Sequence, residues 1–351
     1  MNDNINKNEL FLNYIDKHKQ KVYKKILENI PKSLPKRFDI MVKEYVNRQG
    51  KYARPSFILL WSELHGGNPT EAYLPAATMQ CSEDWILMHD DFEDNNELRR
   101  GKKAAHILYG APQALNAGDY LHIVNWKMVY IAMNQLNKIA NEDVANGFFD
   151  KFYDILLTTA EGQFYDMTLT HEKDITKFTI DDYLKSIHAK SSYYSVYGPM
   201  QLGAILAEKE PKYVERIKKY GEPIGNAFQI KDDILDCLST NEVLGKSVGN
   251  DIREGVKTPI LFDFVQNANE KDLMQVKEIY SKERDKKTSQ DIRFVLDMFK
   301  KYNSYRYAED LIDKLGNEAK DHFEKETIHL PDSPIKEIAR NAIDKMVKRK
   351  K

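Results

Sequence analysis

Residues 88–103 read MHDDFEDNNELRRGKK, a cluster of acids followed at once by a cluster of bases. Asp90 and Asp94 are four residues apart, so on a helix their carboxylates lie on one face, with Asp91 beside them. Like charges at this spacing destabilise an isolated helix by about 0.2–0.5 kcal/mol per pair. The stretch therefore indicates that something compensates the charge, either solvent or a bound cation.

A second acidic cluster repeats this geometry further along the chain. Residues 228–237 read FQIKDDILDC and place Asp232, Asp233 and Asp236 among apolar side chains. A buried carboxylate without a partner is costly, so it is normally avoided or neutralised. One such short motif is weak evidence, because it often arises by chance on a solvated helix end. Two clusters, each at the end of a strongly apolar segment, instead predict an oxygen-only site for Mg²⁺ and a phosphate-bearing substrate.

The composition limits the class of protein. The 351 residues carry 53 Lys plus Arg and 54 Asp plus Glu, which argues against a general nucleic-acid-binding protein. The two cysteines, Cys81 and Cys237, lie far apart and suggest no disulfide framework. The first residues lack the apolar centre of a signal peptide, and no run of about 18 uncharged apolar residues is present. We therefore expect a cytoplasmic protein without stable membrane insertion.

The apolar residues recur mainly at intervals of three and four, which is the helical period. Near the N-terminus, one face of a predicted helix carries Leu10, Phe11, Tyr14, Ile15, Val22 and Ile26. Long helices with a wide apolar arc are predicted over residues 71–98, 113–136, 142–170 and 213–238. No Asn-Gly hairpin signal and no Gly/Ser-rich linker is found, and residues 281–290 are interpreted as a solvated charged loop. The prediction is an all-α fold in a single domain over residues 1–351.

A diphosphate needs cations beyond a metal ion. Candidate bases lie beside Gly, Pro or small polar residues at apparent helix ends, where backbone N–H groups can help to hold an anion. They are Lys51, Arg54, Arg99, Arg100, Lys190, Lys246 and Lys257. Taken singly, each is more often an ordinary surface charge, since 30% of the residues in this chain are charged. The chain has no Walker-type Gly-rich loop, so nucleotide phosphates are not indicated.

Taken together, these motifs resemble the trans-isoprenyl diphosphate synthases (polyprenyl synthetases), especially the short-chain geranylgeranyl and farnesyl diphosphate synthases. The resemblance runs from about residue 45 to residue 262, in the order that the family requires. The matching motifs are GKYARP (50–55), DDFEDNNELRRG (90–101), GDYL (118–121), EGQFYD (161–166), KSS (190–192), FQIKDDILD (228–236) and GKSVGNDIREGVKT (245–258).

The resemblance implies an antiparallel helix bundle around a deep central apolar cavity, assembled as a homodimer. It implies three Mg²⁺ ions that bridge Asp90, Asp94 and Asp232 to an allylic diphosphate. Asp91, Asp233 and Asp236 are implied as secondary metal-binding residues. Asp91, Lys190 and Gln229 are also implied to be catalytic. The implied contacts to the allylic substrate are Arg99, Lys190, Gln229, Lys246 and Lys257, and Ser191 is a further implied substrate contact. Those to isopentenyl diphosphate are Gly50, Lys51, Arg54 and Arg100. KRKK at 348–351 resembles the basic tail that helps to close the site in farnesyl-type members.

Two positions depart from the family's pattern. Seven residues before Asp90, where the family usually has a His or Gln that contacts isopentenyl diphosphate, this chain has Glu83, followed by Asp84. A carboxylate that faces a diphosphate repels it unless the carboxylate is protonated, bridged by metal or turned away. Ser191 replaces the commoner Thr and keeps the hydroxyl. The departure at Glu83 concerns the acceptor site, which is the site for isopentenyl diphosphate.

The implied reaction is a Mg²⁺-dependent head-to-tail (1′-4) condensation of isopentenyl diphosphate with an allylic diphosphate. Trp85 and Ile86 precede Asp90 by five and four residues, and would lie about 6–8 Å deeper along a helix that lines the cavity. An aromatic residue only at the fifth position resembles archaeal-type geranylgeranyl diphosphate synthases. The predicted product is therefore all-trans geranylgeranyl diphosphate (C20), with farnesyl diphosphate (C15) as the alternative.

Two other classes share part of this pattern. A class I terpene cyclase has the first acidic motif but usually carries Ser or Thr where this chain has Asp236. A non-catalytic subunit of a heteromeric synthase tends to lose acids from one motif, whereas both motifs are intact here. The sequence favours chain elongation over both alternatives.

Overall fold

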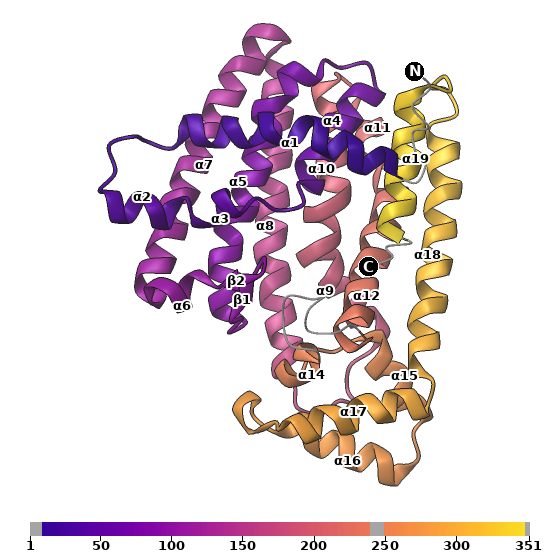
Figure 1. Cartoon of the computed structure of the whole chain (residues 1–351). Coiled ribbons are helices and arrows are strands. Elements are labelled where there is room, and N and C mark those ends of the chain that lie inside the picture. Colours follow the sequence, from indigo (N-terminus) through magenta and orange to yellow (C-terminus); the bar gives the residue numbers. More distant parts are fainter. Residues whose placement is uncertain (1–8, 239–248, 348–351) are drawn as a thin grey trace, which may run out of the picture. The chain divides into compact units, whose positions relative to one another are not determined.

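The computed structural model describes residues 9–238 and 249–347, and most of these residues are helical (Figure 1). The one sheet among them is a hairpin of two short strands, so the predicted all-α fold is confirmed. The chain divides into two compact units. Unit 1 comprises Met1–Ile155, Ser195–Lys218 and Glu324–Ala342, and unit 2 comprises Leu156–Tyr194, Lys219–Phe323 and Ile343–Lys351. The single domain and its central cavity stay predictions.

Unit 1 holds the N-terminal helices and the first acidic motif. Its elements in chain order are α1 (Leu10–Asn29), α2 (Lys36–Val42), α3 (Glu44–Arg48), α4 (Ala53–Leu64), α5 (Pro69–Glu93), β1 (Leu98–Arg99), β2 (Lys102–Lys103), α6 (Ala105–Tyr109), α7 (Ala111–Ile139), the first part of α8 (Glu142–His171), α10 (Gly198–Leu206), α11 (Pro211–Arg216) and most of α19 (Pro334–Val347). Helices α4, α5, α7 and α10 pack side by side at its centre.

Unit 2 holds the second acidic motif. Its elements are the end of α8, α9 (Ile180–Ile187), the π-helix η2 (His188–Tyr197) up to Tyr194, α12 (Lys218–Leu238) from its second residue on, α14 (Asn250–Glu254), α15 (Pro259–Asn267), α16 (Glu270–Ser281), η3 (Arg284–Lys286), α17 (Ser289–Lys301) and most of α18 (Ser304–Glu326). Its apolar core includes Ile230, Ile260, Phe264, Val295 and Phe299, all of which are buried.

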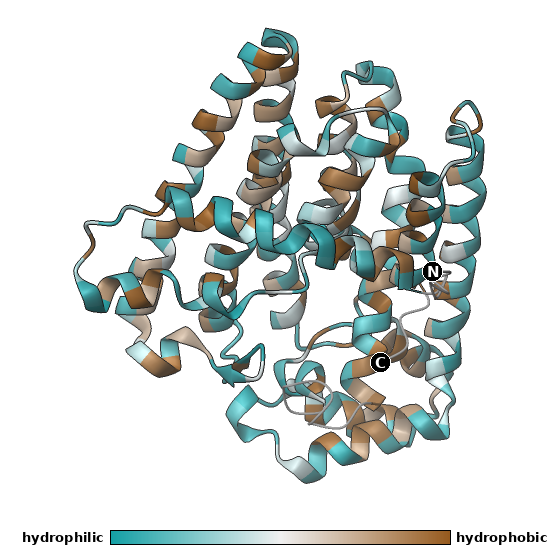
Figure 2. Ribbon diagram, turned by 45° about the horizontal axis from the view of Figure 1, so that its top comes forward, coloured by the Kyte–Doolittle hydropathy of each residue, from teal (hydrophilic) through white to brown (hydrophobic). Residues whose placement is uncertain are grey.

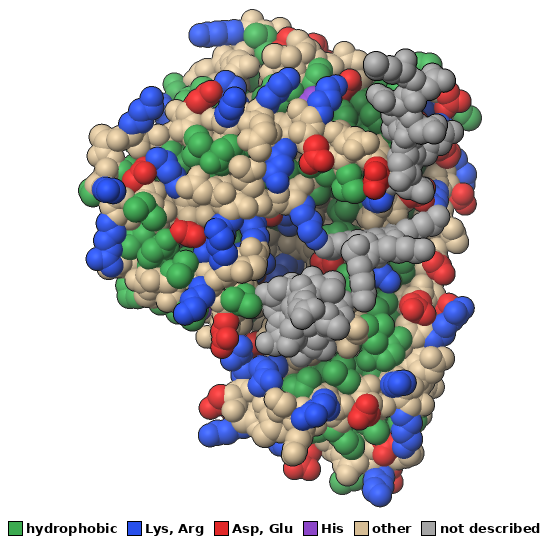
Figure 3. Space-filling model, viewed as in Figure 1, with side chains coloured by type: hydrophobic (Ala, Val, Ile, Leu, Met, Phe, Trp, Pro, Cys, Tyr) green, Lys and Arg blue, Asp and Glu red, His purple; other side chains and the backbone are tan. Residues whose placement is uncertain are grey.

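The predicted apolar face of the first helix is confirmed. Phe11, Tyr14, Ile15, Val22 and Ile26 are all buried along α1, and Leu10 at its start is half-buried. Figure 2 shows hydrophobic and hydrophilic segments in alternation along most helices, as amphipathic helices require. Figure 3 shows Lys and Arg interspersed with Asp and Glu on the face that it draws, which agrees with the balanced charge of the chain. None of the described helices is both long enough and apolar enough to cross a lipid bilayer.

Two of the predicted long helices have different ends in the structure. The helix predicted over residues 71–98 ends at Glu93, because Asp94 caps it and Asn95 turns to a left-handed backbone with φ of 49°. The helix predicted over residues 213–238 is divided between α11 and α12 at Ile217, whose N–H donates to the carbonyl of Val214 only three residues back. Tight turns of this kind commonly end helices.

A hairpin follows the first acidic motif, although the sequence shows no Asn-Gly signal for one. Strands β1 and β2 pair in antiparallel register, and the two residues between them, Arg100 and Gly101, have φ of 52° and 74°. Positive φ at both central residues is the geometry that matches the twist of a two-residue hairpin. Arg48 fastens the hairpin by donating to the backbone carbonyls of Arg99 and Lys103 at 2.9 and 2.8 Å.

The charged loop at residues 281–290 is only partly solvated, so that interpretation is wrong for one of its residues. Asp285 and Lys286 are exposed, but Lys287 is only 3% exposed. Its ammonium group donates to the backbone carbonyls of Ile252 and Arg253 at 3.0 and 2.9 Å. These are carbonyls at the end of α14, where a cation is favourable. Lys287 therefore holds this short helix in place.

Candidate active site

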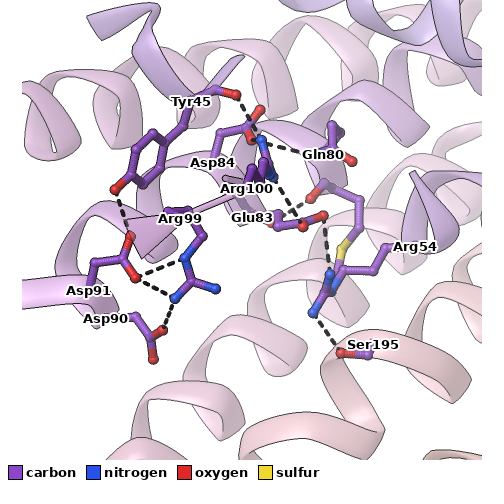
Figure 4. Close-up of polar contacts among 12 residues, drawn as sticks. Tyr45, Arg54, Gln80, Glu83, Asp84, Asp90, Asp91, Arg99, Arg100 and Ser195 are labelled. Atoms are coloured by element: carbon purple, nitrogen blue, oxygen red, sulfur yellow. Dashed lines mark hydrogen bonds and ion pairs between the residues drawn. The ribbon is translucent and has the colours of Figure 1, made fainter. Parts of the chain in front are cut away.

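The first acidic motif ends α5, and its aspartates differ in their surroundings (Figure 4). Asp91 is fully buried, and the Tyr45 hydroxyl donates to its Oδ2 at 2.6 Å. Arg99 Nε donates to Asp91 Oδ1 at 2.8 Å, and Arg99 Nη2 reaches Asp90 Oδ2 at 3.1 Å. Asp90 keeps 19% of its side chain exposed. The buried aspartate therefore anchors the motif, and the first aspartate of the motif remains accessible.

The charges around Arg99 stabilise its cationic form. Burial alone would lower the pKa of Arg99, but Asp91 and Asp90 raise it above its ordinary value. Burial and the charge of Asp91 together raise the pKa of Tyr45, so its hydroxyl stays protonated and donates. The same Tyr45 hydroxyl accepts from the backbone N–H of Ala105 at 2.9 Å. Tyr45 thus joins the acidic motif to the start of α6, a link that no motif in the sequence indicates.

Glu83 lies between two of the predicted phosphate-binding arginines. Its Oε2 atom is 3.1 Å from Arg54 Nη1, and its Oε1 atom is 3.3 Å from Arg100 Nη2. Arg54 also donates to Ser195 Oγ at 2.8 Å, and Arg100 donates to Asp84 Oδ1 at 3.1 Å. Figure 4 shows both guanidinium groups directed at the Glu83 carboxylate. The structure therefore brings together Arg54, Glu83 and Arg100, which the sequence predicts at one subsite.

The pKa values of the neighbouring carboxyl groups of Glu83 and Asp84 shift in opposite directions. Burial would raise the pKa of Glu83, but the charges of Arg54 and Arg100 outweigh burial and lower it. Burial raises the pKa of Asp84 to about 7, because its one charged partner, Arg100, does not fully compensate and Glu83 adds a like charge. Glu83 is therefore ionised at neutral pH. Protonation, which is one way in which its carboxylate could avoid repelling a diphosphate, does not apply.

Gly50 makes room for Arg100. A Cβ atom at residue 50 would lie 2.7 Å from Arg100 Nη2 and 3.1 Å from its Cζ. The guanidinium cannot easily retreat, because it is also held by the Tyr45 carbonyl at 2.8 Å. Tyr52, at φ of 58°, then starts α4 and places Arg54 in its first turn. Lys51 is exposed beside them. The GKYARP motif thus positions one arginine and accommodates another.

The residues predicted to set product length, Trp85 and Ile86, lie on α5, and Trp85 faces α7. Trp85 packs against His122 of α7 with ring centroids 4.3 Å apart. Burial lowers the pKa of His122, and the neighbouring Asp119 only partly opposes this. Gly118 of the GDYL motif lets His89 pack closely, since a Cβ there would be 2.7 Å from His89 Nε2. Sequence reasoning missed His122, which no pattern distinguishes from an ordinary helical residue.

The second acidic motif lies on α12 and repeats the arrangement of the first. Asp233 is buried, and the Tyr183 hydroxyl donates to its Oδ2 at 2.6 Å. Gln229 donates to Asp233 Oδ1 at 3.1 Å and accepts from Ser191 Oγ at 2.8 Å. Burial and the charge of Asp251 raise the pKa of Asp233 well above its usual range. Gln229 therefore contacts both Ser191 and Asp233.

The remaining acids of this motif have separate positions. Asp236 is fully buried, and its Oδ2 accepts from the backbone N–H of Asp251 at 3.0 Å. Its backbone carbonyl accepts from the N–H of Gly249 at 2.9 Å. Asp236 thus anchors the start of α14. Asp232 is only partly buried, like Asp90 and Asp94 of the first motif.

Lys190 is paired within unit 2 and lies on η2. Its ammonium group donates to Asp166 Oδ2 of the EGQFYD motif at 2.7 Å. Gly162 of the same motif lets the backbone of η2 approach α8, because a Cβ atom at residue 162 would lie 2.2 Å from the backbone nitrogen of Lys190. A π-helix widens the turn and often occurs at functional sites. Neither the widened turn nor the pairing with Asp166 could be read from sequence spacing.

Lys257 is buried. It donates to the Gly255 carbonyl at 2.9 Å and lies over the ring of Tyr280, which Lys287 also contacts. Burial lowers the pKa of each lysine to about 8. The predicted contacts of Lys246 and of the basic tail at 348–351 lie outside the described residues.

The donors available for a metal ion are carboxylate oxygens. In the described part of the chain, no three His, Cys, Asp or Glu side chains come together in a way that could hold a metal ion. Mg²⁺ is usually held by one or two carboxylates together with waters and substrate phosphates. The partly exposed carboxylates of Asp90, Asp94 and Asp232 fit that chemistry.

Comparison with known proteins identifies the class of this protein. Residues 35–299 match the polyprenyl synthetase family. The chain is 31% identical to the short chain isoprenyl diphosphate synthase of Methanothermobacter thermautotrophicus over 297 residues, 85% of this chain and 87% of that protein. It is 32% identical to the geranylgeranyl diphosphate synthase of Saccharolobus solfataricus over 76% of this chain and 77% of that one.

A solved structure has the same fold. It is the polyprenyl synthase from Caulobacter crescentus complexed with calcium and isoprenyl diphosphate, with a TM-score of 0.84, 22% identity, and coverage of 97% of this chain and 98% of that one. The chain is thus an all-α prenyltransferase. It belongs to the polyprenyl synthetase family.

Proposed function

We propose that this protein condenses isopentenyl diphosphate with allylic diphosphates to make all-trans geranylgeranyl diphosphate, releasing inorganic diphosphate. The observation that carries the proposal is the matched construction of the two acidic motifs. In each motif a tyrosine hydroxyl 2.6 Å from the second aspartate holds that aspartate in a buried position. The first aspartates, Asp90 and Asp232, stay partly exposed and can bind metal and substrate.

The proposed cofactor is Mg²⁺, with three ions bound by Asp90, Asp94 and Asp232. The oxygen donors support it, as does the calcium in the structure of the Caulobacter crescentus relative. Bound Mg²⁺ supplies positive charge that stabilises the departing diphosphate of the allylic substrate. Asp91, Asp233 and Asp236 support these ligands from buried positions.

The cationic side chains stabilise the same leaving group. We assign Arg99 and Lys190 to the allylic diphosphate, along with Ser191, Gln229, Lys246 and Lys257. Gly50, Lys51, Arg54 and Arg100 form the acceptor subsite for isopentenyl diphosphate. Preorganised donors of this kind stabilise charge that develops as the allylic C–O bond ionises. The isopentenyl double bond then attacks the carbocation, and the proton lost from the adduct passes to the released diphosphate.

The product length that we propose follows from Trp85 and from relatives. Trp85 and Ile86 on α5 would limit the depth available to the growing chain. The Saccharolobus solfataricus relative at 32% identity is a geranylgeranyl diphosphate synthase, which supports C20 over C15. We further propose a cytoplasmic homodimer, the assembly that the family resemblance implies.

Product analysis tests this function. Purified protein is incubated with Mg²⁺, radiolabelled isopentenyl diphosphate and, in separate tubes, C5, C10 and C15 allylic diphosphates, and the products are separated by chromatography. A single C20 diphosphate is expected from each starter. A C15 end product would correct the chain length. Absence of elongation would contradict the proposal, and cyclic hydrocarbons made from the allylic substrates alone would indicate a terpene cyclase.

A further inference from the structure

The Glu83 carboxylate occupies the donors that an acceptor diphosphate would use. Each of its oxygens faces one guanidinium, with Oε2 at 3.1 Å from Arg54 and Oε1 at 3.3 Å from Arg100 (Figure 4). The two arginines come from different segments, the first turn of α4 and the turn of the hairpin. Carboxylates and phosphates compete for the same face of a guanidinium, because both accept paired N–H donors.

The cluster is partly open, so a solute can reach it. Arg54 is 25% exposed and Glu83 is 12% exposed. Asp84, by contrast, is almost fully buried and contacts Arg100 through Nη1, away from the Nη2 atom that Glu83 uses. Of the two carboxylates, Glu83 is therefore the one that lies where an incoming anion meets the guanidinium groups.

Glu83 also changes the charge that this anion meets. Two guanidinium groups without a counter-ion would present two positive charges, and an ionised Glu83 cancels one of them. The pKa of Glu83 is lowered because Arg54 and Arg100 outweigh its burial, so it remains ionised at neutral pH. A bound diphosphate next to an ionised carboxylate is a like-charge contact, which weakens binding.

We propose that Glu83 is a built-in counter-ion of the acceptor subsite that competes with isopentenyl diphosphate for Arg54 and Arg100. The carboxylate holds both arginines in place while the subsite is empty, and it leaves at least one of them when the acceptor binds. Glu83 therefore sets a weak affinity for the acceptor without affecting the allylic subsite. This inference rests on the function proposed above.

Direct binding of isopentenyl diphosphate tests the proposal. The full chain and its Glu83→Gln variant are compared by isothermal titration calorimetry with isopentenyl diphosphate and Mg²⁺. Gln keeps the shape and one carbonyl acceptor but lacks the charge, so the Kd is expected to fall about tenfold or more. The KM for the allylic substrate should stay within about twofold. An unchanged or higher Kd in a folded variant would overturn the proposal.

A matched control separates this effect from the loss of any ion pair. Glu326 is 13% exposed, close to the value for Glu83, and lies 3.2 Å from Arg216 Nε in the same unit. Glu326→Gln removes a comparable carboxylate from an arginine, and the Kd for isopentenyl diphosphate should not change. A decrease equal to that of Glu83→Gln would show a general charge effect and would overturn the proposal.

A structural measurement covers the case in which the variant does not fold. In a crystal structure of the wild-type chain with isopentenyl diphosphate, Glu83 should lie more than about 4 Å from the guanidinium of Arg54 or Arg100. A carboxylate that still bridges both would overturn the proposal. If the wild-type chain elongates prenyl chains but Glu83→Gln does not bind the acceptor more tightly, this inference alone fails. If the wild type neither binds isopentenyl diphosphate nor elongates, the proposed function fails and this inference fails with it.

Discussion

At the residue scale, neighbouring aspartates in the same motif have different roles. Asp91 accepts from Tyr45 and Arg99 and is fully buried, whereas Asp90 keeps part of its carboxylate exposed. Burial of a charged group is tolerated only where partners satisfy it. Adjacent positions on a helix face different directions, so one aspartate anchors the motif while the other remains accessible to a ligand.

Substitution of these two aspartates should separate turnover from stability. Asp90→Asn is expected to lower kcat at least about 100-fold with little change in the free energy of unfolding, because it removes a ligand for metal and substrate. Asp91→Asn is expected to lower the free energy of unfolding by about 1–3 kcal/mol, because the buried partners of this carboxylate lose their charged acceptor. Steady-state kinetics and urea unfolding measure the two effects. Near-normal turnover of Asp90→Asn would contradict the assigned role.

The stability of unit 1 should depend on pH through Asp84. Burial raises the pKa of Asp84 to about 7 from an ordinary value of 3.8, so the folded protein holds this proton more tightly than the unfolded chain. This contribution to stability is complete below a pH of about 4 and is lost as the pH rises through about 7.

Asp84→Asn should remove that dependence. Thermal melts of the wild type and the variant between pH of about 5 and about 8 are expected to diverge, with the wild type losing stability relative to Asp84→Asn as the pH rises. Glu83→Gln provides a comparison, since the pKa of Glu83 is lowered and not raised. Parallel melting profiles for the wild type and Asp84→Asn would contradict the assignment.

At the element scale, close backbone contacts explain why the motifs contain glycine. Gly162 on α8 lies against the backbone of Ala189 and Lys190 in η2, and a Cβ would approach it at 2.2–2.7 Å. Gly147 lies on the same helix, but there a Cβ would meet only a methyl group of Ile205 at 3.4 Å. Only the first glycine is required by packing, because a backbone cannot move aside as a side chain can.

The two glycines make a matched pair for mutation. Gly162→Ala is expected to destabilise the protein by about 3 kcal/mol or more, because the added methyl group overlaps backbone atoms. Gly147→Ala is expected to be neutral or to stabilise by up to about 1 kcal/mol, because alanine is a better helix former than glycine. Urea unfolding of both variants measures the difference. Equal effects would contradict the close approach of α8 and η2.

The contact between α5 and α7 should control product length. Trp85 packs on His122, and its buried Nε1 atom has no hydrogen-bond partner among the described residues, so the indole is held by packing. Trp85→Ala is expected to shift the products beyond C20, because the substitution removes a large ring from the proposed floor of the cavity. Chromatography of the products measures the shift. Exposed Tyr130 of α7 supplies the control, since Tyr130→Ala should leave the product unchanged. An unchanged product of Trp85→Ala would remove Trp85 from the floor.

At the scale of the whole molecule, the proposed chemistry depends on local clusters of charge and not on the net charge. Acidic and basic residues are balanced over the chain at 54 and 53, and the ionic clusters that carry the proposed chemistry are formed by a few residues in each unit. Both units bury apolar side chains in their cores. The stability of each core therefore depends mainly on apolar side chains, and the proposed catalysis depends on the ionic clusters.

Removal of the metal should abolish catalysis without affecting stability. Treatment with EDTA is expected to abolish elongation and to leave the melting temperature within about 2 °C of the untreated protein, because metal does not contribute to either core. Mg²⁺ added back should restore turnover, whereas Ca²⁺ at the same concentration tests metal selectivity. Unfolding on chelation, or full activity without metal, would contradict the proposed cofactor role.

The sequence by itself determined the helical fold, the apolar face of α1, and the residue types of the acidic and basic motifs. These features follow from local periodicity and motif order, which do not depend on distant contacts. Only the tertiary structure decided that Tyr45 and Tyr183 anchor the second aspartates, from positions 46 and 50 residues away. It also decided that α5 stops at Glu93 before a hairpin, and that Glu83 lies between Arg54 and Arg100. A side chain's partner depends on how segments remote in sequence pack together, and spacing along one segment carries no information about that packing.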